Sequence, residues 1–223
     1  KLSRRPNVEF VEARVEGIED GNAGARICTA QQDYEGRWVF DSRFRLPDFH
    51  PDPDRHCYLK MQFRGWELES ADAAFDPETP TFLDFRTPQR GQLRFMYVLP
   101  YSCRRALVEY VVCTDRLLRR AEQQQELTQY VGHILGVRQY RIVGEEQGIS
   151  PMTDYRFPRR VGRRAMTIGV PGGMLKPTTG FAFTRIQRDA AAIVRSLLEY
   201  GHPFRVPATR RPYRLYESLM LRA

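Results

Sequence analysis

Glu109 is the residue whose surroundings in the sequence most clearly favour proton-transfer chemistry. It lies in the run 106–113 (ALVEYVVC), where both faces of an extended strand are apolar, so its carboxyl group is expected to lose water whichever way it points. Burial raises the pKa of a carboxyl group, and an acid that is still protonated near neutral pH can donate a proton. The alternative is a structural glutamate paired with one of the many arginines, and the residues alone do not decide between the two.

A second acidic candidate is the pair Glu145 and Glu146, which precedes the segment 147–153 (QGISPMT). Acids followed by glycine and proline at the end of a strand often lie at the edge of a site, but they are also typical of an ordinary solvated strand end. The second interpretation is favoured here. Water at a strand end holds the pKa of a carboxyl group low, so we expect Glu109 to be the more important acid.

A glycine-rich turn near residue 172 could hold a ligand. Gly172 and Gly173 permit positive φ and a close approach to the backbone, and Pro177 disfavours helix in the residue before it. Thr178 or Thr179 is predicted to cap the helix that follows.

The predicted helix ends at Gly201 and Pro203 and buries one face at three- and four-residue spacing. Its buried residues are expected to be Phe183, Ile186, Ala190, Ile193, Val194 and Leu197. The free N–H groups at a helix start attract an anion or a polarised carbonyl group. The simpler interpretation, a turn that only joins a strand to a helix, is favoured because the turn is neither a Walker loop nor a G-x-G-x-x-G fingerprint.

Composition narrows the possible classes of function. The net charge of +8 comes from 35 basic residues, almost all of them arginines, and these are scattered rather than gathered on one face. A nucleic-acid footprint is more concentrated, so attraction to an anionic membrane surface or a merely solvated surface fits better. No run approaches the roughly 20 apolar residues of a membrane span.

The four cysteines have no C-x-x-C spacing, which argues against structural zinc or a disulfide framework and favours free thiols in a reducing compartment.

The pattern of strands and helices predicts a mixed α/β (α+β) chain of two interwoven domains with a mostly antiparallel inserted sheet. The loop 47–54 (PDFHPDPD) is the clearest boundary, and a helical region is expected from Thr114 or Asp115 to Gly136. The strand-like segments are 8–18, 25–29, 37–41, 58–69, 81–85, 92–99, 105–114, 137–143 and 161–170.

Six of these segments, taken in order, closely resemble the flavin-dependent lycopene cyclases in their bacterial form. The resemblance covers about residues 8–200, and although each motif alone is weak, six in the family's order are specific. The motifs are 63–67 (FRGWE), 83–86 (LDFR), 95–100 (FMYVLP), 106–110 (ALVEY), 148–153 (GISPMT) and 168–181 (IGVPGGMLKPTTGF).

The resemblance implies a fold like the glutathione reductase and FAD-dependent hydroxylase flavoproteins, in which FAD lies between a dinucleotide domain and a sheet-based substrate domain. Residues 1–46 and 158–200 would be parts of the FAD-binding domain, 47–157 the substrate-binding domain, and 201–223 the start of a C-terminal region. The resemblance also implies which residues contact the cofactor. At the flavin ring these are Gly172, Gly173, Thr179 and Gly180. The backbone of Val15 would contact the adenine. Glu109 and Glu146 align with acidic positions thought to matter for cyclisation.

The implied activity is that of a lycopene cyclase, an isomerase that converts the linear ψ ends of lycopene into β-ionone rings without net redox change. Such a reaction needs a proton delivered to an isolated double bond, ring closure through a tertiary carbocation and removal of a different proton. A buried protonated acid and FAD, reduced by NAD(P)H, meet those needs. Because lycopene is insoluble in water, we expect a cytoplasmic enzyme that binds the membrane surface peripherally through arginine charge and exposed apolar groups.

Several departures from the family's pattern bear on these expectations. The G-x-G-x-x-G fingerprint is absent, which predicts a parent protein with that unit upstream of Lys1 and little flavin bound by residues 1–223 alone. Ser150 replaces a common apolar residue. A related hydroxylase or isoprenoid reductase is disfavoured because those relatives carry Gly-Asp where this chain has Gly169 and Val170. The remaining alternative is a cofactor-free remnant or interaction module without turnover.

Overall fold

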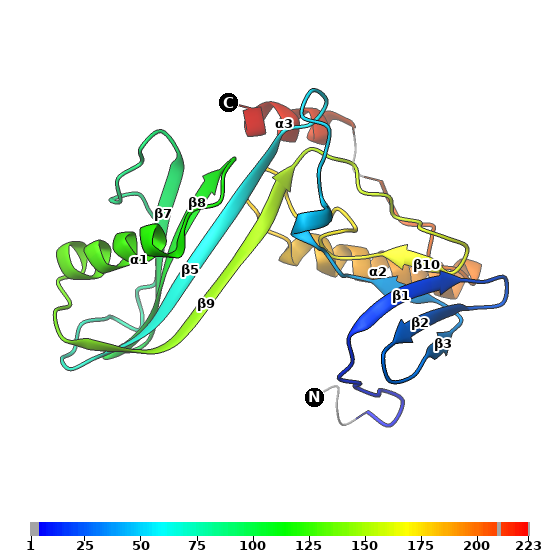
Figure 1. Cartoon of the computed structure of the whole chain (residues 1–223), viewed down its shortest axis with the longest axis horizontal. Helices are drawn as coiled ribbons and strands as arrows, with labels where there is room; N and C mark the ends of the chain where they lie inside the picture. Colours follow the sequence, from blue (N-terminus) through cyan, green and yellow to red (C-terminus); the bar gives the residue numbers. More distant parts are fainter. Residues whose placement is uncertain (1–4, 209–210, 223) are drawn as a thin grey trace. The chain divides into compact units, whose positions relative to one another are not determined.

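The computed structural model describes residues 5–208 and 211–222, which fall into two compact units (Figure 1). The first unit contains residues 5–44, 156–175 and 181–208. The second contains residues 45–155, 176–180 and 211–222. Each unit is built from segments that are distant in the sequence, and each is described by itself.

The second unit is built on a five-stranded antiparallel sheet with the order β6-β7-β8-β5-β9. Its strands are β5 (Tyr58–Ser70), β6 (Thr81–Asp84), β7 (Leu93–Ser102), β8 (Arg105–Thr114) and β9 (Tyr140–Thr153). The predicted short strand 137–143 is wrong, because β9 continues ten residues further. As an edge strand it tolerates Pro151, and it pairs with β5 over its whole length.

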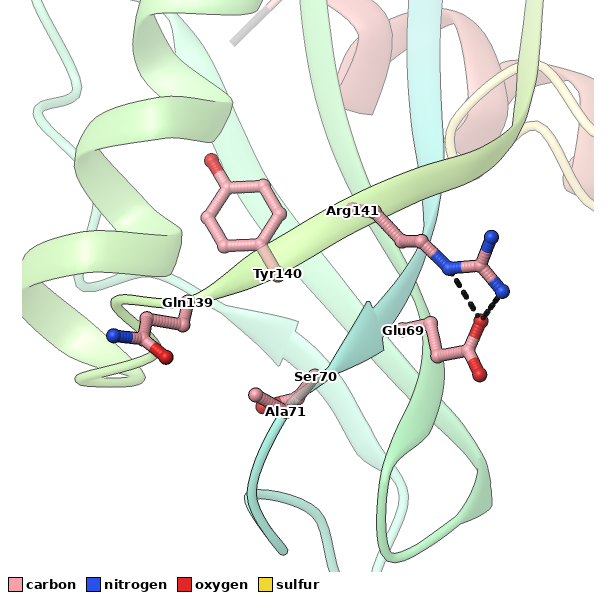
Figure 2. A pocket seen from close by; sticks show the side chains of 6 residues that line it. All are labelled: Glu69, Ser70, Ala71, Gln139, Tyr140 and Arg141. Carbon is pink, nitrogen blue, oxygen red and sulfur yellow. Dashed lines mark hydrogen bonds and ion pairs between the residues drawn. The ribbon is translucent and has the colours of Figure 1, made fainter.

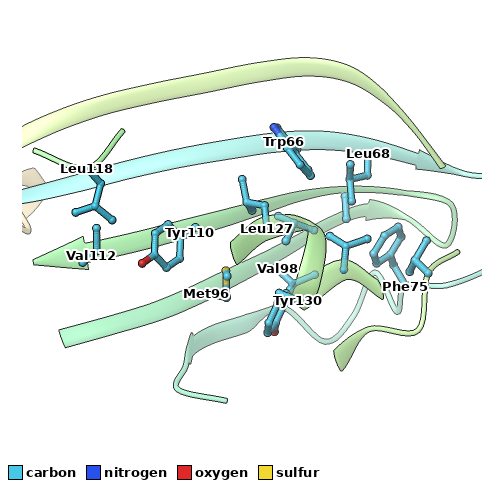
Figure 3. Packing of buried hydrophobic residues seen from close by; sticks show 14 residues of the cluster. Trp66, Leu68, Phe75, Met96, Val98, Tyr110, Val112, Leu118, Leu127 and Tyr130 are labelled. Atoms are coloured by element: carbon cyan, nitrogen blue, oxygen red, sulfur yellow. The ribbon is translucent and has the colours of Figure 1, made fainter. Parts of the chain in front are cut away.

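One face of this sheet packs against helix α1 (Arg120–Gln129) and the π-helical turn η3 (Tyr130–Ile134) (Figure 3). The main members of this core are Trp66, Leu68, Met96, Val98, Tyr110, Val112, Leu127 and Val131. The helix begins later than the predicted Thr114 or Asp115. Gln62 on β5 holds the preceding loop by accepting a hydrogen bond from the Leu118 N–H (2.8 Å) and donating one to the Arg116 carbonyl (2.7 Å).

The same unit contains the helix α3 (Arg211–Arg222) and the short 3-10 helix η2 (Leu46–Asp48). Leu221 of α3 packs with Cys113 and Met152 at one end of the other sheet face.

The first unit contains two small sheets and one long helix. The antiparallel sheet is made of β1 (Val15–Asp20), β2 (Ala25–Thr29) and β3 (Tyr34–Gly36), and β4 (Val39–Asp41) pairs in parallel with β10 (Ala165–Thr167). A small core joins the two sheets through Ala25, Val39 and Ala165.

Helix α2 (Phe183–Tyr200) starts after a turn rather than at the predicted threonine caps. The N–H groups of Thr179 and Gly180 both donate to the carbonyl of Lys176, which closes a separate turn, and Ala182 is the N-cap residue of α2. The predicted end at Gly201, with φ of 69°, is confirmed. The predicted buried face is largely wrong: of its six residues Ile193 is buried, whereas the Phe183 side chain is 77 % exposed.

Candidate active site

Glu109 and Glu146 lie in one row across the sheet, on the face opposite helix α1. We call this the acid face. Gly65 of β5 pairs with Glu109 of β8 on one side and with Glu146 of β9 on the other, and Tyr97 of β7 pairs with Glu109. Directly opposed residues of neighbouring strands point to the same face with their Cβ atoms about 5 Å apart. Strand register therefore assembles the row Tyr97, Glu109, Gly65, Glu146 from four separate stretches of sequence.

The glycine in the middle of the row makes room for the second carboxyl group. A Cβ atom at Gly65 would lie 2.9 Å from Cγ of Glu146 and 2.9 Å from Cδ1 of Leu107, closer than real contacts allow. The Glu146 side chain thus occupies the space above Gly65, where it reaches toward Glu109.

At two further positions along β5 and β9, a large side chain of β5 faces a glycine of β9. Phe63 is paired with Gly148, and a Cβ atom at Gly148 would overlap Cζ at the outer end of the Phe63 ring. Glu67 is paired with Gly144, where an added Cβ atom would be 2.9 Å from Oε2 of Glu67. The glycines of β9 therefore leave room for the side chains of β5, and the strand continues past both of them, with one shift of register between Glu67 and Leu68 next to Gly144.

The carboxyl group of Glu109 is the proton-holding member of the pair. Burial is the largest effect on its pKa, followed by a hydrogen bond with Glu146 and repulsion from its charge, and together they raise the pKa of Glu109 to about 8. A like charge beside a buried carboxyl group disfavours its ionised form, so Glu109 keeps its proton at neutral pH. The predicted rise in the pKa of Glu109 is confirmed, and its partner is a second carboxyl group rather than an arginine.

Glu145 and Glu146 have different partners although they are adjacent. They lie in the middle of β9, not at a strand end as predicted, so their side chains point to opposite faces of the sheet. Glu145 forms ion pairs with Arg64 (3.3 Å) and Arg120 (3.0 Å) on the α1 face. Glu146 is left on the acid face beside Glu109.

The surface around the acid pair is mainly apolar and aromatic. The row on one side of the acid pair consists of Phe95, Val111, Phe63 and Gly148, and the row on the other consists of Leu99, Leu107, Glu67 and Gly144. Glu67 is neutralised by Arg105, whose guanidinium lies 2.6 Å away. Apart from the carboxyl pair itself, an apolar molecule that lies on this face would meet no charge in these three rows that is not neutralised.

Gly180 contacts the same face four residues along β5. A Cβ atom at Gly180 would overlap Cε and Sδ of Met61, and Gly180 has a φ of 70° that favours glycine. Met61 and Gly65 share a face because they are four residues apart in a strand, about 13 Å at the usual rise per residue. The structure therefore brings Gly180 onto the acid face, together with the turn that contains Thr179.

Gly172 and Gly173 form a tight turn in the first unit that is fixed by Arg159, a residue the sequence did not single out. Nη1 of Arg159 donates to the Gly172 carbonyl (3.1 Å), and its Nη2 donates to both carboxylate oxygens of Asp189 in α2 (2.7 and 2.9 Å). Because Asp189 is the single acidic residue in the first four turns of α2, its isolation was a signal that could have identified the pair. Arg159 thus ties the glycine turn to the helix.

The remaining predicted contact, Val15, lies at the start of β1. Its carbonyl oxygen accepts a hydrogen bond from Nη1 of Arg43 (3.2 Å), and Arg43 is in turn paired with Asp41 of β4 (2.9 Å). The backbone of Val15 is therefore held by its own unit.

A hollow of about 330 Å³ lies at the far end of β5 and β9, away from the acid pair (Figure 2). It is lined by residues 69–71 and 139–141, and Arg141 forms an ion pair with Glu69 (2.5 Å) at its rim. Glu69 is four residues beyond Gly65 in β5, so this hollow is separate from the acid pair.

Comparison of the chain with known proteins identifies its relatives. Residues 2–218 match the family described as "Lycopene cyclase protein". Neoxanthin synthase from Solanum lycopersicum is 24% identical over an alignment of 207 positions, and the match covers 86% of this chain and 41% of that protein. Lycopene beta cyclase from Narcissus pseudonarcissus is 26% identical over an alignment of 148 positions, and the match covers 61% of this chain and 29% of that protein. The chain thus spans less than half the length of these curated relatives.

Solved structures share the fold at low sequence identity. A geranylgeranyl bacteriochlorophyll reductase-like protein from Thermoplasma acidophilum is 15% identical with a TM-score of 0.61, and the match covers 94% of this chain and 53% of that protein. HpxO from Klebsiella pneumoniae, solved in complex with FAD, is 15% identical with a TM-score of 0.53 and coverages of 94% and 56%. The predicted mixed α/β flavoprotein fold with an antiparallel sheet is confirmed. Since its family match extends over nearly the whole chain, this protein belongs to the lycopene cyclase family.

Proposed function

We propose that this chain carries the acid–base centre of a carotenoid cyclase that converts the linear ends of lycopene into β-ionone rings. The observation that carries the proposal is the meeting of Glu109 and Glu146 over Gly65, on an apolar sheet face, with the pKa of Glu109 raised to about 8. A reaction on a hydrocarbon needs an acid that keeps its proton at neutral pH and that an apolar molecule can reach. Membership of the lycopene cyclase family supports the same substrate class.

The proposed sequence of steps starts with Glu109. Its carboxyl group gives a proton to the terminal double bond of the substrate, and the positive charge then forms on the neighbouring tertiary carbon. A second double bond of the same chain attacks that carbon and closes the ring. Loss of a proton from a ring carbon restores a double bond, and a carboxylate of the pair accepts that proton. The pair returns to its starting charge, and the product is an isomer of the substrate.

The cofactor that belongs to this proposal is FAD, reduced by NAD(P)H. The glycine turn fits a flat ring, because Gly173 has a φ of 74° and open space where a Cβ atom would point, while Arg159 holds the turn through Gly172. Within the first unit, Gly172 and Gly173 would contact the flavin. The backbone of Val15 would contact the adenine. When bound and reduced, the flavin supplies an electron-rich surface that favours nearby positive charge.

The test of the function is product formation by the whole gene product that contains this chain. We expect the purified protein, given lycopene in vesicles under reducing conditions with FAD, to form a cyclised carotenoid of the same mass as lycopene. Chromatography with mass and absorbance detection measures this. A product that is two hydrogen atoms heavier would instead indicate a reductase, and one that is an oxygen atom heavier would indicate a hydroxylase.

Peripheral binding to an anionic membrane surface is part of the same proposal. No helix within residues 5–208 and 211–222 has the length and apolar character needed to cross a bilayer. The net charge of +8 predicts salt-sensitive binding to anionic vesicles, at about 1 kcal/mol per basic residue near the surface. Sedimentation with vesicles of different charge measures the effect, and equal binding to neutral and anionic vesicles would remove the electrostatic part of the proposal.

A further inference from the structure

The aromatic residues of the acid face form a continuous series of edge-to-face contacts that passes beside the acid. Tyr97 contacts Phe82 (5.2 Å between ring centroids, 72° between planes) and Phe95 (5.2 Å, 74°), and Phe95 contacts Phe85 (6.0 Å, 70°). We call these four residues the aromatic series. Phe82 and Phe85 at its ends are 61 % and 51 % exposed, so the series is open to a ligand.

Tyr97 is the member of the series that meets the proton donor. It is paired with Glu109 across β7 and β8, on the side of Glu109 away from Gly65 and Glu146. Burial, and then the charge of Glu109, raise the pKa of Tyr97, which is consistent with their closeness. Its two edge-to-face contacts fix the plane of the ring before any ligand binds.

The position of Tyr97 matters because of where positive charge would form. A proton donor must lie about 3 Å from the carbon that accepts the proton, and the charge then forms on the next carbon. The Cβ atoms of Tyr97 and Glu109 are about 5 Å apart because the two residues are paired across the strands. The Tyr97 ring can therefore reach a carbon atom that lies next to the Glu109 carboxyl group. The face of an aromatic ring attracts a cation within about 6 Å of its centroid.

We propose that the ring of Tyr97 stabilises the carbocation formed on protonation by Glu109, and is thus a further catalytic residue of the acid face. This inference rests on the proposed cyclase function. The ligand it names is the charged form of an unsaturated hydrocarbon. The ring adds stabilisation that appears only after proton transfer, because the unreacted hydrocarbon carries no charge.

The test compares Tyr97→Phe with Tyr97→Leu in the whole gene product. Tyr97→Phe keeps the ring and should retain kcat within about threefold. Tyr97→Leu keeps apolar contact but loses the ring, and kcat should fall by roughly 2- to 30-fold, the range expected for cation–π interactions, with KM little changed. A product one water molecule heavier than lycopene should also appear as the cation escapes. Tyr101→Leu, the same change at an exposed tyrosine of β7 outside the aromatic series, is the control and should leave kcat unchanged.

A second measurement keeps the shape of the ring constant. Replacing Tyr97 by phenylalanine with one, two or three ring fluorines weakens the negative face step by step, and kcat should fall with each fluorine. An unchanged kcat in Tyr97→Leu, an equal loss in Tyr97→Phe, or a flat fluorine series would each overturn the inference. If the unmodified protein forms no ring at all, the proposed function fails instead, so the two failures are distinguishable.

Discussion

Glu109→Gln should lower the turnover of the complete cyclase by about a hundredfold to ten-thousandfold, the usual effect of removing a general acid. Glutamine keeps the size and polarity of the side chain but has no carboxyl proton to give. The fold should persist, since Glu109 is held between neighbouring strands by backbone pairing with Gly65 and Tyr97. The measurement is the rate of cyclised carotenoid formation, with the flavin content and the melting temperature of each variant determined alongside.

Two further variants give this prediction its controls. Glu146→Gln should lower turnover less, because that side chain is the more exposed member of the pair and the proton resides on Glu109. Glu67→Gln removes a carboxylate from the same face that is already neutralised by Arg105, so it should leave turnover nearly unchanged. Near-normal turnover in Glu109→Gln would refute the assignment of the acid, and a larger loss at Glu146 would reverse the order of the two.

The dependence on pH follows from the direction of the shift. Because the pKa of Glu109 is raised to about 8, the acid form is populated below that value and turnover should fall as the pH rises through it. The same shift means that the folded state binds the proton more tightly than the unfolded state does. The free energy of unfolding should therefore decrease between about pH 4.5 and pH 8, and Glu109→Gln should lack this contribution.

The environment of Glu109 could be predicted from its own stretch of sequence, but its partner could not. An apolar run on both sides of a carboxyl group is local information, and burial is indeed the largest influence on its pKa. The pairing with Glu146 depends on the register of β5 against both β8 and β9, which joins Gly65 to Glu109, 44 positions later, and to Glu146, 81 positions later. No local pattern encodes that register.

The glycines of β9 explain why its extent was missed. Gly144, Gly148 and Pro151 are typical of a loop, and they led to a predicted strand end at residue 143. In the structure the first two accept side chains from β5, and the proline is tolerated at the sheet edge. The function of these glycines depends on the side chains of β5 that lie opposite them, and β5 is about 80 residues earlier in the chain.

Gly65→Ala should separate the two carboxyl groups and lower turnover by about a hundredfold, the effect expected when a reacting group moves by about 1 Å. The added methyl group would lie 2.9 Å from Cγ of Glu146 and 3.2 Å from its Oε1, so the Glu146 side chain must move away from Glu109. With Glu146 displaced, its hydrogen bond and its charge no longer raise the pKa of Glu109, although burial still does. The fall in turnover at high pH should therefore shift to lower pH.

Gly144→Ala is the matched control for this variant. It adds the same methyl group to the adjacent cross-strand pair on the same face, but there the contact is with Oε2 at the flexible end of Glu67. Both variants should cost about 1 to 3 kcal/mol of unfolding free energy through overpacking, so a difference in turnover between them reports the acid pair rather than stability. Chemical denaturation measures the free energy of unfolding, and the cyclisation rate as a function of pH measures the turnover. If Gly65→Ala kept both the turnover and the pH profile of the unmodified protein, the closeness of Glu109 and Glu146 would have no role in the reaction.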